Sequence, residues 1–420
     1  MPGERVLYVT PTMPRRSGNG LAMRAAAMLD ALARLFDVHL FVVPVAGTPG
    51  ASSDFVRRTA TRIGGLDLAT SLDPLYALIG RVLDPQQRAQ AELAYPKPYL
   101  SRFCSADSAD KLLEWSNQFA VDAVHVMRLY LAPLAQPFLR RRRAGRPFCV
   151  LDLDDDDAQT CRRLMRLHSD LGDRRAAAVA AAEADKYDVL ARRYLAAFDR
   201  VTVCSETDAG RLFTSFPDAR LAVVPNGYPP TDCSRRHCPP APGPLRLLFV
   251  GTLGYFPNAD AARFLCHRVL PALRRLTDRD IRIELVGAGD TAALADLPRH
   301  PEVRLHGFVG DLAPLYAPAD VAVVPVRAGG GTRIKLLEAF AHRVPVVATK
   351  LGAEGIDAAD GEHLSLADDA EAFARACLDV KQNSAQAAAR ASRAAALLAA
   401  RYSPVQVDAA VAEVYRHRRV

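Results

Sequence analysis

The sequence has no apolar run long enough to cross a membrane and no extended basic stripe of the kind that nucleic-acid-binding proteins carry. The net charge of +7 arises from 30 Lys and Arg against 26 Asp and Glu in residues 1–225, and from 24 against 21 in the remainder. Because this excess is spread over both halves, no nucleic-acid partner is expected. The first strand-like run begins at Arg5 and leaves no room for a signal peptide, so we expect a cytoplasmic protein.

The sequence also lacks a cysteine framework. Its eight cysteines are scattered, and several lie in apolar runs, which is typical of free buried thiols in a reducing compartment. The one close pair, Cys233 and Cys238 with His237 between them, has no second pair nearby to complete four zinc ligands. We therefore expect no metal site there.

The only dense basic run is Arg140 to Arg143, followed by Arg146. A solvated loop is the simpler interpretation. The alternative is a peripheral membrane contact, in which these side chains meet anionic lipid headgroups or another acidic surface.

A chain of 420 residues is long enough for two domains. Short β-branched runs alternate with longer helical patterns, which predicts parallel sheets with helical crossovers. The expected strands are residues 6–10, 38–43, 123–126, 148–153, 201–204, 221–224, 245–250, 281–286, 303–306, 321–325 and 344–348.

We therefore predict an α/β protein made of two Rossmann-like, doubly wound domains. The first comprises residues 1–225, a proline-rich linker spans 226–244, and the second comprises 245–400. A final helix is expected within 401–420, with Val407, Val411 and Val414 on one face.

The most informative motif follows the strand predicted at 321–325. It begins with three glycines, Gly329, Gly330 and Gly331. A helix is expected to begin at the next residue, Thr332. Three charged residues follow, the cations Arg333 and Lys335 and the carboxylate Glu338. Glycines let backbone N–H groups approach an anion, and the helix N-terminus and both cations favour the same charge. The motif predicts a diphosphate site, with Glu338 placed to accept hydrogen bonds from ribose hydroxyls. A plain glycine-rich turn is the alternative.

Three companion loops also follow strands of the second half. Gly251 comes after the first strand and would face the phosphates, whereas Gly287 and Gly289 end the next strand. Phe308 and Val309 follow the third strand and would line a slot for the base. Taken singly, each loop is equally well explained as a structural turn.

In the first half, a loop containing Gly18, Asn19 and Gly20 follows the first strand and leads into a helix. His125 ends a strand, where an acceptor-site role and a core histidine are equally plausible, and Arg128 follows it. Asp152 and Asp154 to Asp157 end the next strand. A helix cap with a solvated acidic loop is the leading interpretation of this acidic run; the alternatives are an acceptor-site role for Asp154 or Asp155, and a Mg²⁺ site.

At this point a resemblance can be stated. Residues 245–375 resemble the donor-binding domain of retaining glycosyltransferase family four, also described as glycosyl transferases group 1, which has the two-domain GT-B architecture. The motifs that carry the resemblance are Leu-Phe-Val-Gly251, Glu-Leu-Val-Gly-Ala-Gly289, Val-Arg-Leu-His-Gly307, Ala-Asp-Val-Ala-Val-Val-Pro325 and the stretch from Gly331 to Val347.

The resemblance implies that Glu338 holds the ribose, that the loops at Gly289 and Phe308 hold the base, and that Gly330 to Lys335 hold the diphosphate. It implies a donor-phosphate role for the Gly18–Gly20 loop, which also lies beside the acceptor. It further implies a cleft between the domains, and a final helix that packs back on the N-terminal domain.

Two departures from the family pattern matter. Gly330 stands where the family has the first of two glutamates, the one that ordinarily meets the donor sugar. The loop after Gly251 lacks the usual Arg and Lys, so Arg333 and Lys335 are inferred to supply the positive charge, as in a Gly-Thr-Arg variant of the motif.

The predicted function is transfer of a sugar, with retention of anomeric configuration, from a nucleotide-diphosphate sugar to an acceptor. The expected catalytic residues are Arg333, Lys335 and His125, and neither a cofactor nor a metal is expected. The acceptor is a glycan, a lipid-linked saccharide or a small molecule. The alternatives are a nucleotide-sugar epimerase or hydrolase on the same fold, and a non-catalytic sugar-nucleotide-binding protein.

Overall fold

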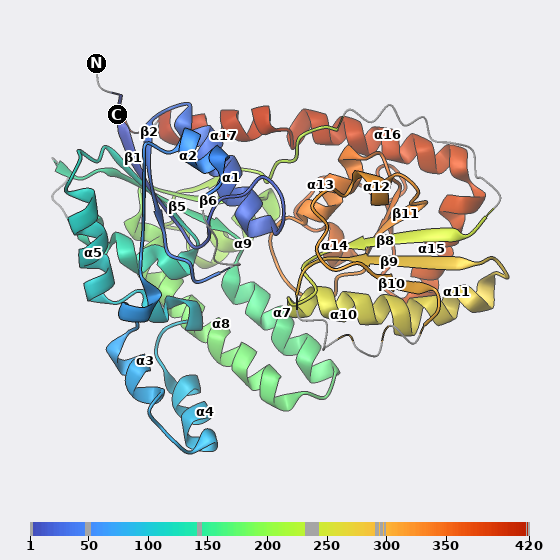
Figure 1. Cartoon of the computed structure of the whole chain (residues 1–420), viewed down its shortest axis with the longest axis horizontal. Helices are drawn as coiled ribbons and strands as arrows, with labels where there is room; N and C mark the ends of the chain where they lie inside the picture. The colour runs from blue at the N-terminus through green and yellow to red at the C-terminus, as the bar shows by residue number, and fades with distance from the viewer. Residues whose placement is uncertain are drawn as a thin grey trace. The chain divides into compact units, whose positions relative to one another are not determined.

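The computed structural model describes residues 3–46, 52–140, 145–231, 243–289, 294, 297, 300–416 and 418. The chain divides into two compact units (Figure 1), Met1–Pro225 with Val407–Val420, and Asn226–Gln406. Each unit is built on one parallel sheet with helices packed against it. The predicted α/β class with two doubly wound sheets is confirmed.

The first unit has seven strands among its described residues. They are β1 (Arg5–Thr10), β2 (Asp37–Val42), β3 (Arg62–Gly65), β4 (Ala123–Met127), β5 (Phe148–Asp154), β6 (Arg200–Val203) and β7 (Leu221–Val223). Its helices are α1 (Gly20–Ala33), α2 (Asp54–Thr59), α3 (Pro74–Ile79), α4 (Pro85–Ala94), α5 (Ala106–Ser116), α6 (Gln136–Leu139), α7 (Asp157–Asp170), α8 (Arg174–Tyr194) and α9 (Glu206–Ser215). Short 3₁₀ segments are η1 (Leu68–Thr70), η2 (Tyr99–Phe103), η3 (Leu129–Ala135) and η5 (Leu195–Ala197).

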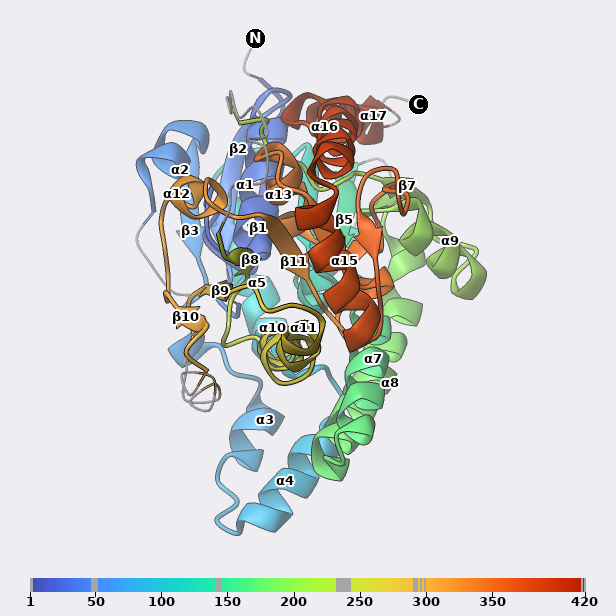
Figure 2. The ribbon, with the colours of Figure 1, turned by 90° about the vertical axis from the view of Figure 1, so that its right-hand side faces the viewer.

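The strand order of this sheet is β3-β2-β1-β4-β5-β6-β7, and all its pairs are parallel. Alternate residues of β1 and β4 therefore enter two different apolar clusters, one on each face. The helices α7 and α8 run side by side as a hairpin (Figures 1 and 2).

The last helix, α17 (Pro404–Arg416), packs on the first unit. Val407, Val411 and Val414 are buried in the same apolar cluster as Tyr8 of β1 and Leu29 of α1. The face predicted from the i, i+4, i+7 spacing is therefore the buried one, and the return of this helix to the N-terminal half is confirmed.

The described part of the second unit has six strands. They are β8 (Leu245–Val250), β9 (Ile281–Val286), β10 (Val303–Leu305), β11 (Val321–Val324), β12 (Val346–Ala348) and β13 (Ser365–Leu366), in the order β10-β9-β8-β11-β12-β13. Its helices are α10 (Phe256–Phe264), the π-helical turn η6 (Leu265–Val269), α11 (Leu270–Leu276), α12 (Ala313–Tyr316), α13 (Ile334–Ala341), α14 (Lys350–Ala353), α15 (Ala370–Gln382) and α16 (Ser384–Arg401).

The eleven predicted strands are all present, within two residues at each end. Sequence patterns missed two strands, β3 and β13. Both are short, and each hydrogen-bonds to one neighbouring strand only. β3 also contains Gly64, where an added Cβ would lie 2.5 Å from the Trp115 ring, so packing selects a residue that disfavours strands. None of the described helices is both long enough and apolar enough to cross a membrane.

A buried ion pair connects α1 to the middle of the first sheet. Arg24 donates from Nη2 to Asp152 Oδ1 over 2.6 Å and from Nε to Oδ2 over 2.9 Å. Thr202 Oγ1 donates to the same carboxylate over 2.8 Å. Burial alone would raise the pKa of Asp152, but the adjacent guanidinium holds this pKa below its ordinary value.

This geometry predicts that Asp152→Asn strongly destabilises the first unit, because it removes the bidentate counter-charge of a buried guanidinium, which keeps only the longer contact of 3.5 Å to Asp154. The expected loss is about 3–5 kcal/mol in the free energy of unfolding, measured by urea denaturation. Asp30→Asn is the matched control, since it breaks the exposed Arg16–Asp30 pair and is expected to cost less than about 1 kcal/mol. Equal losses in the two variants would contradict the assignment.

Candidate functional site

Both sheets reverse their strand order at one place, between β1 and β4 in the first and between β8 and β11 in the second. In open parallel sheets, ligands bind beyond the carboxyl ends of the strands at such a switch point. In the second unit, Gly251 directly follows β8, and residues 325–333 connect β11 to α13. The structure therefore brings the predicted phosphate-site residues of this unit to one edge of the sheet.

The loop before α13 folds around the side chain of Arg333. Arg333 Nη1 donates to the carbonyl oxygen of Gly330, and a Cβ added to Gly329 would lie 3.4 Å from Nη2. Arg333 Nε and Nη2 are buried and have no hydrogen-bond partner within the described part of the chain. A guanidinium with two unused nitrogens beside a glycine loop suits an anionic ligand.

Lys335 lies in the first turn of α13, with its ammonium enclosed. Nζ donates to Asn258 Oδ1 of α10 over 2.7 Å and lies 4.5 Å from the centre of the Phe249 ring. Burial, followed by the repulsion from Arg333, lowers the pKa of Lys335 to about 7. Near neutral pH the amine is therefore only partly protonated.

Gly251 is required by this arrangement. A Cβ at this position would lie 2.7 Å from Lys335 Nζ and 2.9 Å from Asn258 Cγ, which is closer than real Cβ contacts allow. The absent side chain thus leaves room for the ammonium directly beneath the loop that follows β8. Asn258 also donates to the Thr252 carbonyl oxygen over 3.0 Å and so fixes the loop.

Glu338 lies one turn further along α13 and is only 9% exposed. Its Oε1 accepts a hydrogen bond of 2.7 Å from the Tyr228 hydroxyl, and its Oε2 accepts one of 3.3 Å from the Tyr316 hydroxyl. Burial raises the pKa of Glu338, and these two hydrogen bonds act in the opposite direction.

The loops that follow β9 and β10 lie against the loop that follows β8. A Cβ on Gly287 would lie 1.7 Å from the Gly251 carbonyl oxygen, so only glycine fits. Gly287 N in turn donates to the Gly307 carbonyl oxygen over 2.8 Å. Phe308, which is 66% exposed, and Val309 lie in the loop that follows β10. Gly289 lies in the loop that follows β9. The three companion loops are therefore adjacent.

In the first unit, the loop after β1 leads into α1. Asn19 caps this helix by accepting a hydrogen bond of 2.9 Å from Ala22 N. Gly18 has a left-handed backbone with φ of 112°, and Gly20 is the first helical residue. Asn19 is therefore the N-cap of α1, at the carboxyl end of β1.

His125 requires a correction. It lies in the interior of β4 and is 2% exposed, and its Nδ1 is 2.9 Å from the Tyr415 hydroxyl of α17. Burial lowers the pKa of His125 to about 4, which keeps the ring neutral. The core alternative therefore holds, because this side chain points into the face that α17 covers and not beyond the strand end. His125 is not part of the candidate site.

The acidic run is a helix cap and an ion-pair network. Asp156 caps α7 by accepting from Gln159 N over 3.0 Å, and Asp157 pairs with Arg128. The predicted cap is confirmed, whereas the solvated loop is wrong, because Asp157 is 8% exposed and burial raises its pKa to about 7. Among the described residues, no three His, Cys, Asp or Glu side chains form a group that could hold a metal ion.

Two more of the predicted acceptor residues belong to this network. Asp154 lies 3.3 Å from Arg128 Nη1 and 3.5 Å from Arg24 Nε. Asp155 accepts a hydrogen bond of 2.9 Å from Thr160 Oγ1, and it lines a cavity of about 250 Å³ together with Tyr187 and Phe216.

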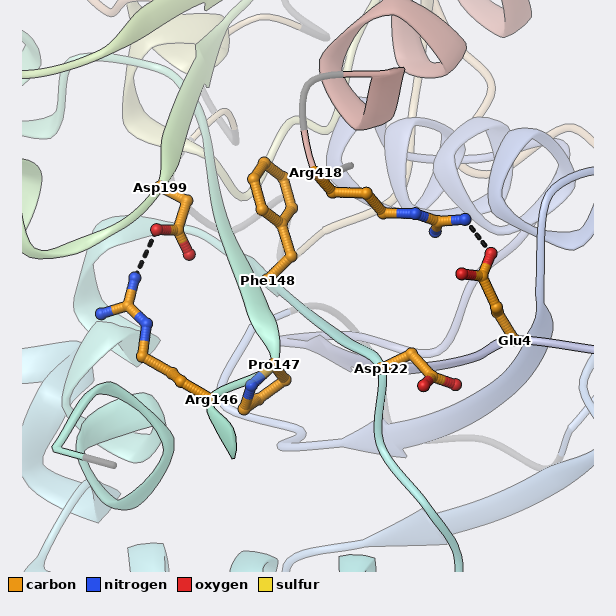
Figure 3. A pocket seen from close by; sticks show the side chains of 7 residues that line it. All are labelled: Glu4, Asp122, Arg146, Pro147, Phe148, Asp199 and Arg418. Carbon is orange, nitrogen blue, oxygen red and sulfur yellow. Dashed lines mark hydrogen bonds and ion pairs between the residues drawn. The ribbon is translucent and has the colours of Figure 1, made fainter. Parts of the chain in front are cut away.

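Another cavity of the first unit lies at the opposite end of the sheet. Its volume is about 280 Å³, and Figure 3 shows Phe148 between the Arg146–Asp199 and Arg418–Glu4 ion pairs. Apart from Arg418, which follows α17, these residues lie at the starts of strands or just before them, so the cavity is not at the end of the sheet where ligands bind in this class of fold. Cys233, Cys238 and most of the Arg140–Arg143 run lie outside the described residues.

The sequence of the second unit settles its family. Residues 244–383 match the family model described as glycosyl transferases group 1. This segment is a glycosyl transferases group 1 domain. The resemblance inferred from the motifs between Gly251 and Val347 is thus confirmed, and the loops described above are those of a group 1 domain. No curated protein matches the chain.

Solved structures extend the likeness to the whole chain. Sucrose-phosphate synthase from Thermosynechococcus elongatus is 14% identical, with 98% of each chain covered and a TM-score of 0.67. HepE of Anabaena, in complex with UDP and glucose, is 15% identical, with 98% of this chain and 99% of HepE covered and a TM-score of 0.64. The E. coli trehalose-6-phosphate protein bound with UDP-2-fluoro glucose is 14% identical, covers 99% of both chains and has a TM-score of 0.63. The chain has the GT-B fold of these proteins.

Sequence reasoning missed Asn258, Tyr228 and Tyr316. Tyr228 lies in an irregular segment after β7, and Tyr316 lies at the end of a four-residue helix. Neither tyrosine lies in a recognisable sequence motif. Each donates to Glu338, which is distant from it in the sequence.

The lowered pKa of Lys335 predicts a specific pH dependence of stability. In the unfolded chain a lysine has a pKa of about 10.4, so above about pH 7 the unfolded state binds more protons than the folded state. The free energy of unfolding should therefore rise with pH between about 7.5 and 9 through this residue. Lys335→Met should lose this contribution, measured as the difference between urea denaturation curves of the two proteins. Curves that stay parallel over this range would contradict an enclosed, neutral amine.

Proposed function

We propose that the protein is a retaining glycosyltransferase that moves a sugar from a nucleotide-diphosphate sugar to an acceptor hydroxyl. The observation that carries this proposal is the pair of cations at the β8–β11 switch point, Arg333 with two unpartnered nitrogens and Lys335 beneath Gly251. The group 1 domain supports the reaction class, and the UDP complexes of HepE and of the trehalose-6-phosphate protein support the class of donor.

The donor would lie along the edge of the second sheet. Its diphosphate meets Gly329 to Gly331, Thr332, Arg333 and Lys335. Its ribose meets Glu338, and its base meets the loops at Gly289 and Phe308. This order matches the order of the loops along the edge, from β11 through β8 to β9 and β10.

In the proposed reaction, the bond between the anomeric carbon and the diphosphate oxygen breaks, and the acceptor oxygen bonds to the same face of that carbon. The acceptor proton passes to the departing diphosphate. Negative charge grows on that leaving group, so preorganised donors from Arg333 and Lys335 lower the barrier. The proton that Lys335 gains when the anion binds makes its charge available in this step.

The acceptor would bind to the first unit, near the Gly18–Gly20 loop at the carboxyl end of β1. The cavity beside Asp155 offers carboxylates that accept hydrogen bonds from hydroxyl groups, and the aromatic rings of Tyr187 and Phe216 beside them. This combination suits a sugar ring, which has polar edges and an apolar face. Arg128 and Asp154 would shape this region through their ion pair.

One observation favours a second candidate function. Gly330 leaves the site without the carboxylate that ordinarily meets the donor sugar, which suits a non-catalytic sugar-nucleotide-binding protein. Such a protein would bind UDP-glucose yet release no UDP with any acceptor. The two functions are distinguished by measuring UDP release from UDP-glucose in the presence of monosaccharide, disaccharide or glycan acceptors. UDP release supports the transferase, and binding of UDP-glucose without UDP release supports the non-catalytic protein.

Arg333→Ala is expected to weaken UDP binding about tenfold to a hundredfold, since a charged hydrogen bond contributes about 1.5–3 kcal/mol. Uridine binding should change little, because uridine has no phosphate. Isothermal calorimetry measures both. Lys350→Ala is the control, as this lysine is exposed on α14. An unchanged UDP affinity in Arg333→Ala would exclude the proposed phosphate site.

We further propose that the reaction needs no divalent metal, because side-chain cations stand at the diphosphate position. Activity is then expected to persist in excess EDTA, measured as UDP release from UDP-glucose. Loss of turnover in EDTA that Mg²⁺ or Mn²⁺ restores would overturn this proposal and would place a metal beside the diphosphate.

A further inference from the structure

The carboxylate of Glu338 accepts hydrogen bonds from two tyrosine hydroxyls. Tyr228 donates to Oε1 over 2.7 Å, and Tyr316 donates to Oε2 over 3.3 Å. An ionised carboxylate accepts hydrogen bonds and donates none, so both of its oxygens are suited to hydroxyl partners. Two hydroxyl groups on one carboxylate are also what a ribose 2′,3′-diol presents.

The two tyrosines are not equivalent. Tyr316 is 2% exposed and its ring stacks on His342 with a centroid distance of 4.4 Å, so packing holds it in place. Tyr228 is only partly buried and lies in an irregular segment, where its backbone N–H donates to the Tyr402 carbonyl oxygen over 2.9 Å. Because Tyr228 is partly exposed and Tyr316 is fully buried, moving the Tyr228 hydroxyl away from Glu338 disturbs less of the core.

Glu338 needs a partner at Oε1 at all times. It is 9% exposed, and a buried carboxylate oxygen without a hydrogen bond is costly. Burial raises the pKa of Glu338, and the hydroxyl of Tyr228 helps to keep the group ionised. A ligand that reaches Glu338 must therefore replace the hydrogen bond that it displaces.

We propose that the Tyr228 hydroxyl occupies the place of a ribose hydroxyl until the donor binds, and that donor binding exchanges it for the 2′,3′-diol. This inference rests on the proposed function and names its substrate class. A full diol replaces the lost donor and adds one more, whereas a 2′-deoxyribose only replaces it. The site is therefore specific for ribonucleotide donors over deoxyribonucleotide donors, since a site built for a hydroxyl rejects an analogue that lacks it.

The decisive variant is Tyr228→Phe, which keeps the ring and removes the competing hydroxyl. In the empty variant Glu338 Oε1 loses its partner, and ribose restores it. UDP affinity is expected to rise about tenfold, whereas 2′,3′-dideoxyuridine diphosphate should bind as it does to the wild type. Calorimetry gives both affinities, and thermal unfolding without ligand confirms that the variant folds.

Tyr316→Phe is the matched control. It removes the hydroxyl on the buried side of the same carboxylate, where no ligand group can reach, so it should give no gain in UDP affinity. A gain of equal size in both variants would overturn the exchange, because it would reflect only an unsatisfied carboxylate. Weaker UDP binding by Tyr228→Phe would overturn it as well, since Tyr228 would then position Glu338 in the bound state.

The substrate class has its own test. Wild-type protein is expected to bind UDP at least about tenfold more tightly than 2′-deoxyuridine diphosphate, and Glu338→Gln should lose this preference. Equal affinities in the wild type would overturn the ribonucleotide preference while leaving the diphosphate site intact. Failure of the wild type to bind UDP, GDP or their sugars at all would instead overturn the proposed function.

Discussion

The enclosed amine of Lys335 makes the contacts on which the candidate ligand-binding edge of the second unit depends. It joins α13 to α10 through Asn258, lies over the ring of Phe249 at the end of β8, and fills the space that Gly251 leaves. An ammonium in such surroundings loses much of its hydration, which is why its pKa falls to about 7. The loss of hydration disfavours the charged form of Lys335, and a bound anion would stabilise that form again.

The surrounding glycines follow from the same constraint. The loop after β8 can lie on Lys335 only without a side chain at Gly251, and the loop after β9 can pack on it only without one at Gly287. The backbones of the loops after β8 and β9 therefore lie in direct contact beside Lys335. No side chain of Gly251 or Gly287 covers the backbone at this edge of the sheet. In the first unit the corresponding edge is organised differently, because Arg24 and Arg128 already have their carboxylate partners there.

Charge balance therefore separates the two switch points. Arg24 and Arg128 of the first unit pair with Asp152, Asp154 and Asp157, and of these two only Arg128 Nε has no partner among the described residues. Arg333, by contrast, keeps two nitrogens without a partner in the described part of the second unit. A buried charge that the protein does not neutralise is a place for a ligand of opposite charge. This contrast, more than the Gly-rich sequence of either loop, supports the proposal that the second unit binds the anion.

The sequence by itself determined the two sheets, the strands that build them and the buried face of α17, because these depend on periodic apolar patterning that is local in the chain. It also placed Arg333, Lys335 and Glu338 after one strand, since the motif is contiguous. It left His125 and the acidic run open, and only the tertiary structure decided them. His125 is a core residue because α17, nearly three hundred residues later, brings Tyr415 onto its ring. Asp154 and Asp157 form ion pairs because β4 places Arg128 beside them. Asn258, Tyr228 and Tyr316 gained their partners in the same way, through contacts between distant segments that leave no pattern in the sequence.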